Sequence, residues 1–144
     1  MAYGHRRHNQ GNPEEIKKVI ERINDVEQLK EINPKEYADE EGYADKIANN
    51  SQLDTTQLRK FFGAIREIEK EEKWSDMETD FYLLKPKLAY AAGRDLIKKP
   101  FYQFMMACMR KVDVGTEEEK VENFKVMVNF LEAVVAYHKF YNTR

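Results

Sequence analysis

The sequence predicts an all-α protein, a compact bundle of five to six helices. Charged residues make up 35% of the 144 residues and apolar residues 42%, with only six Gly and four Pro, a mixture typical of helical proteins. Apolar residues recur three or four positions apart in several segments, which is the spacing of one buried helix face. Alternation with the period of a β-strand is lacking over any useful length. We expect a mobile tail over residues 1–12 and a single helical-bundle domain over residues 13–144.

The first helix has a clear start signal. Asn12 is expected to cap it, with Pro13 in the first turn, because an amide oxygen can accept a free helix N–H and proline has none to satisfy. The helix is expected to continue to the pair Asn33–Pro34, which breaks it. A second, weaker and acid-rich segment begins there and is interrupted at Gly42.

The middle of the chain is expected to hold two long helical segments. The first starts at Asp54 or Thr55 and ends before Ser75, a further capping residue. The second runs from about residue 76 to Gly93, and Pro86 should kink or split it, because proline removes a backbone donor and its ring clashes with the carbonyl four residues back.

Two more helices complete the predicted bundle. Pro100 opens the first of them, and a turn at Gly115 follows. Thr116 and Glu119 have the spacing of a capping box at the start of the last helix, which is expected to run to about Asn142. This helix carries the strongest apolar periodicity in the chain.

Positive charge is concentrated in one stretch of this weakly acidic chain. Residues 85–111 contain seven basic residues and one acidic residue, a formal charge of +6, whereas the whole chain has a net charge of −2. The basic residues are Lys85, Lys87, Arg94, Lys98, Lys99, Arg110 and Lys111. Such a cluster can bind a polyphosphate, and Arg94 is the first candidate because a guanidinium can contact a phosphate through two hydrogen bonds. The alternative is a solvated, lysine-rich helix face.

Four aromatic residues near or within this stretch could serve as stacking groups for bases. They are Tyr82, Tyr90, Phe101 and Phe104. All four fit core positions at helical spacing, so we interpret them as packing residues.

No catalytic constellation is evident. The chain lacks a Gly-rich phosphate loop, a serine elbow and the histidine–carboxylate spacings of metal-binding bundles. His138 is interpreted as a packed or hydrogen-bonding histidine, and Cys108 as a small buried hydrophobe. We therefore expect neither an enzyme nor a cofactor or metal site. The longest apolar runs fall well short of the roughly 20 residues that cross a bilayer, and the first ten residues lack an apolar signal core, so a cytoplasmic protein with no membrane partner is expected.

Three segments carry a resemblance to a known family. They are TTQLRKFF at 55–62, LKPKLAYAAGR at 84–94 and FLEAVVAYHK at 130–139. Found together in this order, they resemble the small α-helical subunit of the type III-A CRISPR effector, the Csm complex. The resemblance covers roughly residues 50–142.

The resemblance implies a structural, RNA-binding role without catalysis. Several copies of such a subunit stack as a filament beside the backbone subunits and face the guide–target duplex, while RNA and DNA cleavage belong to the backbone and large subunits. Guide RNA, target RNA, these subunits and copies of the chain itself are then the implied partners. The candidate RNA contacts are Arg59, Lys60, Lys85, Lys87, Arg94 and Lys139.

Two other interpretations remain open at this point. A helical-bundle adaptor could bind protein partners only and use its basic face against an acidic surface. A metal-dependent bundle enzyme is the third and weakest interpretation. Sequence alone does not separate basic residues that face RNA from those that face a neighbouring subunit.

Overall fold

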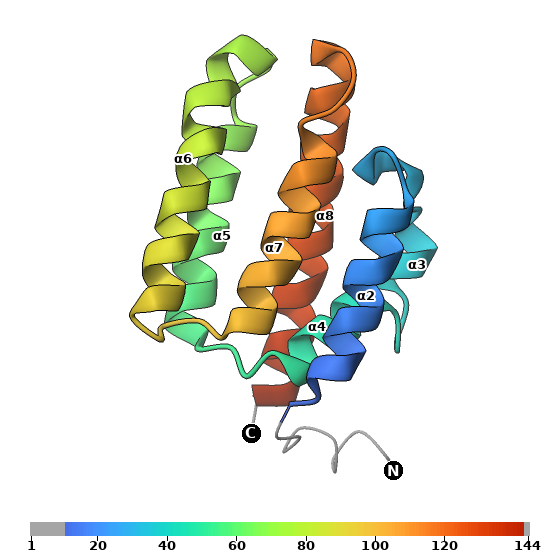
Figure 1. The fold of residues 1–144 in the computed structure, drawn as a ribbon, viewed down its shortest axis with the longest axis vertical. Helices are drawn as coiled ribbons and strands as arrows, with labels where there is room; N and C mark the ends of the chain where they lie inside the picture. The colour runs from blue at the N-terminus through green and yellow to red at the C-terminus, as the bar shows by residue number, and fades with distance from the viewer. Residues whose placement is uncertain (1–10, 143–144) are drawn as a thin grey trace.

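The computed structural model describes residues 11–142, and the regular elements in this part of the chain are helices (Figure 1). They are α2 (Pro13–Asp25), the 3₁₀ turn η1 (Leu29–Glu31), α3 (Pro34–Ala38), α4 (Tyr43–Asn50), α5 (Thr55–Glu69), α6 (Trp74–Gly93), α7 (Lys99–Val112) and α8 (Glu117–Asn142). Six helices of the described part have eight residues or more. The predicted all-α bundle is confirmed. The expected mobile tail lies almost entirely outside the described residues.

The predicted helix starts are present with their capping bonds. The Asn12 side chain accepts the backbone N–H two residues further on at 3.0 Å, and the Asp54 side chain accepts the one three residues further on at 3.0 Å. Thr116 and Glu119 form the predicted capping box: the Thr116 N–H donates to Glu119 Oε1 (2.9 Å) and the Glu119 N–H to Thr116 Oγ1 (3.1 Å). Because these signals need only neighbouring residues, the sequence could predict them.

The end of the first helix differs from the prediction. α2 stops at Asp25 rather than continuing to Asn33. The chain that follows is irregular but still buries apolar side chains, those of Val26, Leu29 and Ile32. A buried amide on α8 provides the physical reason, because Asn123 Oδ1 accepts the Lys30 N–H at 2.8 Å and so satisfies a donor that a continued helix would have used.

The start and the middle of α6 also differ. The helix begins at Trp74, and Ser75 lies exposed in its first turn rather than capping it. Burial of the Trp74 ring against Phe81, with ring centroids 5.1 Å apart, accompanies this earlier start. Pro86 does not split the helix, which is continuous to Gly93. Pro86 faces outward, where it displaces no core side chain.

The long helix α8 occupies the middle of the bundle. It packs against α4, α5 and α7, and more lightly against α3 and α6. Figure 1 shows α5 and α6 side by side on one flank of the molecule and α2, α3 and α4 on the other. Five phenylalanines are fully buried in the core: Phe81, Phe101, Phe104, Phe124 and Phe130. Because α5 and α6 form the outer pair, only part of α6 faces this core.

The aromatic prediction is therefore half right. Phe101 and Phe104 are core residues, whereas Tyr90 is 62% exposed and Tyr82 is 37% exposed. Helical spacing alone could not separate them, because it does not show which face of α6 meets the rest of the bundle. Across the described residues, no helix is both long enough and apolar enough to span a membrane.

Candidate nucleic-acid interface

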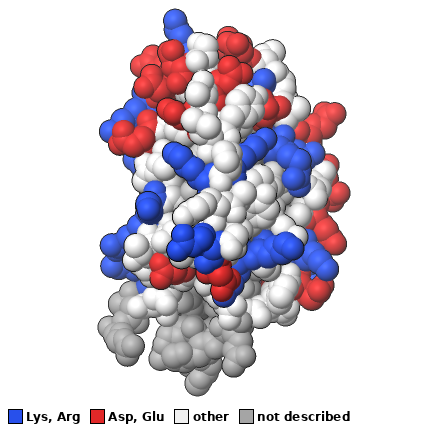
Figure 2. Space-filling model, turned by 60° about the vertical axis from the view of Figure 1, so that its left-hand side comes forward, with Lys and Arg blue, Asp and Glu red and all other residues white. Residues whose placement is uncertain are grey.

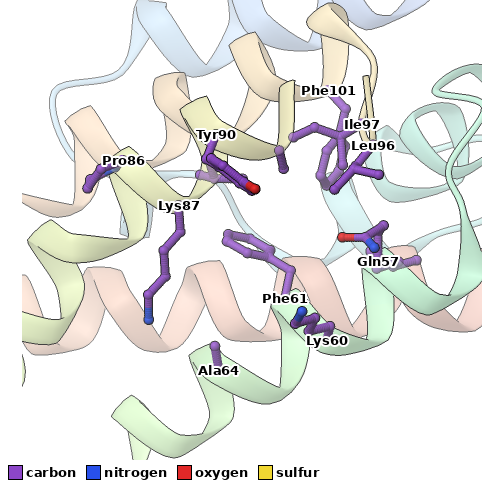
Figure 3. A pocket seen from close by; sticks show the side chains of 13 residues that line it. Gln57, Lys60, Phe61, Ala64, Pro86, Lys87, Tyr90, Leu96, Ile97 and Phe101 are labelled. Atoms are coloured by element: carbon purple, nitrogen blue, oxygen red, sulfur yellow. The ribbon is translucent and has the colours of Figure 1, made fainter. Parts of the chain in front are cut away.

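A pocket of about 540 Å³ lies between α5, α6 and the connection from α6 to α7 (Figure 3). Its wall is apolar and includes Leu58, Phe61, Leu88, Leu96, Ile97 and Phe101. Gln57, Lys60, Lys87 and Tyr90 add polar groups to the lining. Two candidate contacts from different helices, Lys60 on α5 and Lys87 on α6, thus border one hollow.

Two further candidate contacts lie on α6 and at its end, each beside an exposed tyrosine. The Lys85 ammonium is 5.6 Å from the ring centroid of Tyr82. The Arg94 guanidinium is 5.6 Å from the ring centroid of Tyr90, and its Nη1 donates a hydrogen bond to the tyrosine oxygen at 2.7 Å. Both contacts are cation–π pairs, which hold a cation in place without neutralising its charge.

Among the described residues, no carboxylate pairs with the cations of this flank. Arg59, Lys60, Lys85, Lys87 and Arg94 form no ion pair within residues 11–142. Figure 2 shows Lys and Arg side chains over the middle and lower parts of this face. Asp and Glu side chains gather at its upper end, where α5 ends and α6 begins, and along the right-hand edge of the view, with a smaller acidic group lower down.

The remaining two candidates, Arg59 and Lys139, border a different hollow. A pocket of about 110 Å³ between α5 and α8 is lined by both of them together with Thr55, His138 and Asn142. Although Arg59 directly precedes Lys60, the two side chains open onto different sides of α5. The six candidates therefore do not form one group. Lys60 and Lys87 border the larger pocket, whereas Arg59 and Lys139 border the smaller one. Lys85 and Arg94 line neither pocket.

His138 is a packed, hydrogen-bonded histidine, as the sequence suggested. It is buried, its Nε2 lies 2.9 Å from Thr55 Oγ1, and Asn142 Nδ2 lies 3.2 Å from its Nδ1. Burial lowers the pKa of its imidazole, so the neutral form is favoured. Cys108 is buried as expected, and burial raises the pKa of its thiol. No group of three or more His, Cys, Asp or Glu among the described residues could hold a metal ion.

The basic stretch of the sequence does not form one patch. Lys98 pairs with Asp95 at 3.4 Å. Arg110 and Lys111 lie in the last turn of α7, roughly 16–18 Å along the helix axis from Lys99 at about 1.5 Å per residue. The sequence did not identify Gln57 and Phe61 as site residues. They line the same pocket as residues of α6 only because α5 packs against α6.

Together these features define a class of protein: an α-helical bundle with a basic, aromatic-edged face and, in its described part, no grouped metal-ligating side chains. A family profile, Csm2 Type III-A, matches residues 33–144. The chain belongs to this family, the structural small subunit of the type III-A Csm complex of CRISPR systems. The match begins before residue 50, so it includes α3 and α4, to which the resemblance had not been extended. Among curated proteins and solved structures, no match was found.

Proposed function

We propose that this small subunit binds RNA without cleaving it. In this proposal several copies stack as a filament beside the backbone subunits of the cytoplasmic complex and contact guide and target RNA through phosphates. The observation that carries the proposal is the position of Lys60 and Lys87, which come from two helices, border one pocket and form no ion pair within residues 11–142.

Unpaired surface cations are suited to this role for an electrostatic reason. Each Lys or Arg that meets a phosphate releases condensed counterions, which gives affinity with little sequence preference. A small subunit that must accept any target selected by a guide needs contacts of this kind. Cations on α2 are different, because Lys17 and Lys18 lie 3.7 and 3.3 Å from Glu14 and Glu15.

The test replaces Lys60, Lys87 and Arg94 with alanine and measures how much target RNA the assembled complex retains as salt increases. Because each lost phosphate contact lowers the salt slope by about one, we expect the slope to fall by roughly two to three. The double substitution Lys17→Ala with Lys18→Ala is the control, since it removes similar charge from cations that already have partners. An unchanged slope in the triple variant would contradict phosphate binding at this face.

The apolar wall of the same pocket favours the second candidate function, an adaptor that binds protein partners only. A triple variant that fails to assemble with the other subunits would support the adaptor. A variant that assembles normally and retains less RNA would support the RNA-binding subunit.

A further inference from the structure

The pocket between α5 and α6 combines two kinds of surface that a phosphate-binding face alone would not need. Its wall is apolar and partly aromatic, and its edge is cationic. In Figure 3 the Phe61 ring from α5 and the Tyr90 ring from α6 point into the space between the two helices. Lys60 lies beside Phe61, and Lys87 extends from α6 toward Ala64.

We propose that this pocket receives one unpaired RNA base, and that Lys60 and Lys87 hold the phosphates on either side of it. The proposal rests on the RNA binding proposed above and adds a base-binding site to it. The pocket accepts any of the four bases, because every base has an apolar face that can stack on an aromatic ring.

The size and chemistry of the pocket fit this occupant. A volume of about 540 Å³ lies within the range of about 300–1,000 Å³ that is usual for small-molecule sites. The Phe61 side chain is only half-buried, so part of its ring is open to a ligand. The Gln57 amide, which also lines the pocket, offers both a donor and an acceptor to the edge of any base.

Tyr90 is the second stacking group, and its exposure and its contact with Arg94 both suit this role. It is the most exposed of the large hydrophobic side chains in the described residues, at 62%, and an aromatic ring so exposed contributes little to the core. Arg94 donates a hydrogen bond to its phenolic oxygen at 2.7 Å, which restrains the ring at the edge of the pocket. A restrained ring loses less conformational entropy when a base stacks on it.

The charge at the pocket edge favours a nucleotide over an apolar side chain of another protein. Lys60 and Lys87 form no ion pair within residues 11–142, so an occupant that leaves them unpaired gains no electrostatic energy from them. Every base in an RNA strand has a phosphate on each side. An apolar protein side chain would need acidic residues placed on both sides to match the same edge.

The test uses the assembled complex with 4-thiouridine distributed through its target RNA and ultraviolet crosslinking. We expect a crosslinked peptide that contains Phe61 or Tyr90. Ala91→Trp, which fills the pocket from a half-buried wall position, should reduce this crosslink at least tenfold. Leu83→Trp is the matched control, because Leu83 is 47% exposed on the same helix and does not line the pocket.

Tyr90→Leu gives an independent variant at an exposed position, where misfolding is not a concern, and it should also reduce the crosslink. A crosslink that survives both Ala91→Trp and Tyr90→Leu would overturn base insertion while phosphate binding stands. Loss of assembly in Ala91→Trp, with normal assembly of Leu83→Trp, would overturn it in favour of a protein side chain. If substitution of Lys60 and Lys87 with alanine left the salt slope of RNA retention unchanged, the RNA-binding proposal itself would be contradicted.

Discussion

Arg94 donates a hydrogen bond from Nη1 to the phenolic oxygen of Tyr90 at 2.7 Å, and its guanidinium carbon lies 5.6 Å from the centre of the tyrosine ring. The two residues are four positions apart at the end of α6, so their side chains meet on one face. Both are exposed, which makes the pair a weak contributor to stability. The arrangement leaves the guanidinium charge available at the helix C-terminus.

Arg94→Ala should weaken RNA retention by the assembled complex alike for unrelated target sequences. Loss of one phosphate contact should lower the salt slope by about one, while the free energy of unfolding should change by less than about 0.5 kcal/mol because the site is exposed. Arg94→Lys should give an intermediate affinity, since it keeps the charge but loses the two-pronged contact. Retention measured over a range of KCl concentrations tests this. An effect limited to one target sequence would indicate base readout by Arg94 instead.

Asn123→Ala should destabilise the protein by about 2 kcal/mol or more, because it leaves buried backbone groups without their hydrogen-bond partner. The buried amide accepts from the Lys30 N–H (2.8 Å) and donates to Gln28 Oε1 (3.1 Å) and to the Val112 carbonyl (3.3 Å). Urea unfolding followed by circular dichroism measures the change. Asn24→Ala, at an exposed position on α2, should cost little. Equal stability of the two variants would mean that this amide does not hold the 26–33 connection against α8.

Glu119→Gln should flatten the acid side of the stability profile. The Thr116 N–H, followed by the Lys30 and Gln28 side chains, lowers the pKa of Glu119 from 4.5 to about 2. The folded state therefore binds fewer protons than the unfolded state, so this stabilisation is complete above about pH 4.5 and is lost as the pH falls toward 2.

Urea unfolding of both proteins from pH 7 down to pH 2 gives the measurement for Glu119. The stability difference between them should shrink across the window below pH 4.5. Glu118→Gln, an exposed neighbour outside the capping box, is the control. A difference that is constant with pH would show that the carboxylate is not held by these donors.

Pro86→Ala should stabilise the protein by about 2 kcal/mol, because proline inside a helix is roughly 3 kcal/mol less favourable than alanine. Pro86 lies inside α6 at an exposed position, so the substitution opens no core cavity. Thermal unfolding monitored by circular dichroism measures the gain. Pro100→Ala is the matched control, since Pro100 lies in the first turn of α7, where a missing N–H costs nothing. No gain in Pro86→Ala would mean that the proline ring, which lines the pocket between α5 and α6, contributes packing there.

Local sequence signals predicted the fold class and most helix starts. The capping bonds of Asn12, Asp54 and Thr116 join residues at most three apart, so they need no knowledge of the rest of the fold. The ends at Gly93 and Asn142 were also predicted. The end of α2 was not, because it depends on an amide from α8, which lies 93 positions away in the sequence from the donor it accepts.

The candidate site was predicted only in its parts. The basic stretch grouped Arg110 and Lys111 with Lys87 and Arg94, but those two lie at the far end of α7. Lys60 lay outside that stretch and became a candidate only through the family resemblance. The sequence also assigned Tyr90 to the core, whereas its side chain is exposed in the structure.

By itself, then, the sequence determined an all-α bundle, its capped helix starts and its membership of a CRISPR small-subunit family. Only the tertiary structure decided which cations share a surface and that an apolar hollow lies between them. The physical reason is that capping and periodicity act within a few residues, whereas the pocket exists only where α5 and α6 pack side by side and leave one face of each uncovered.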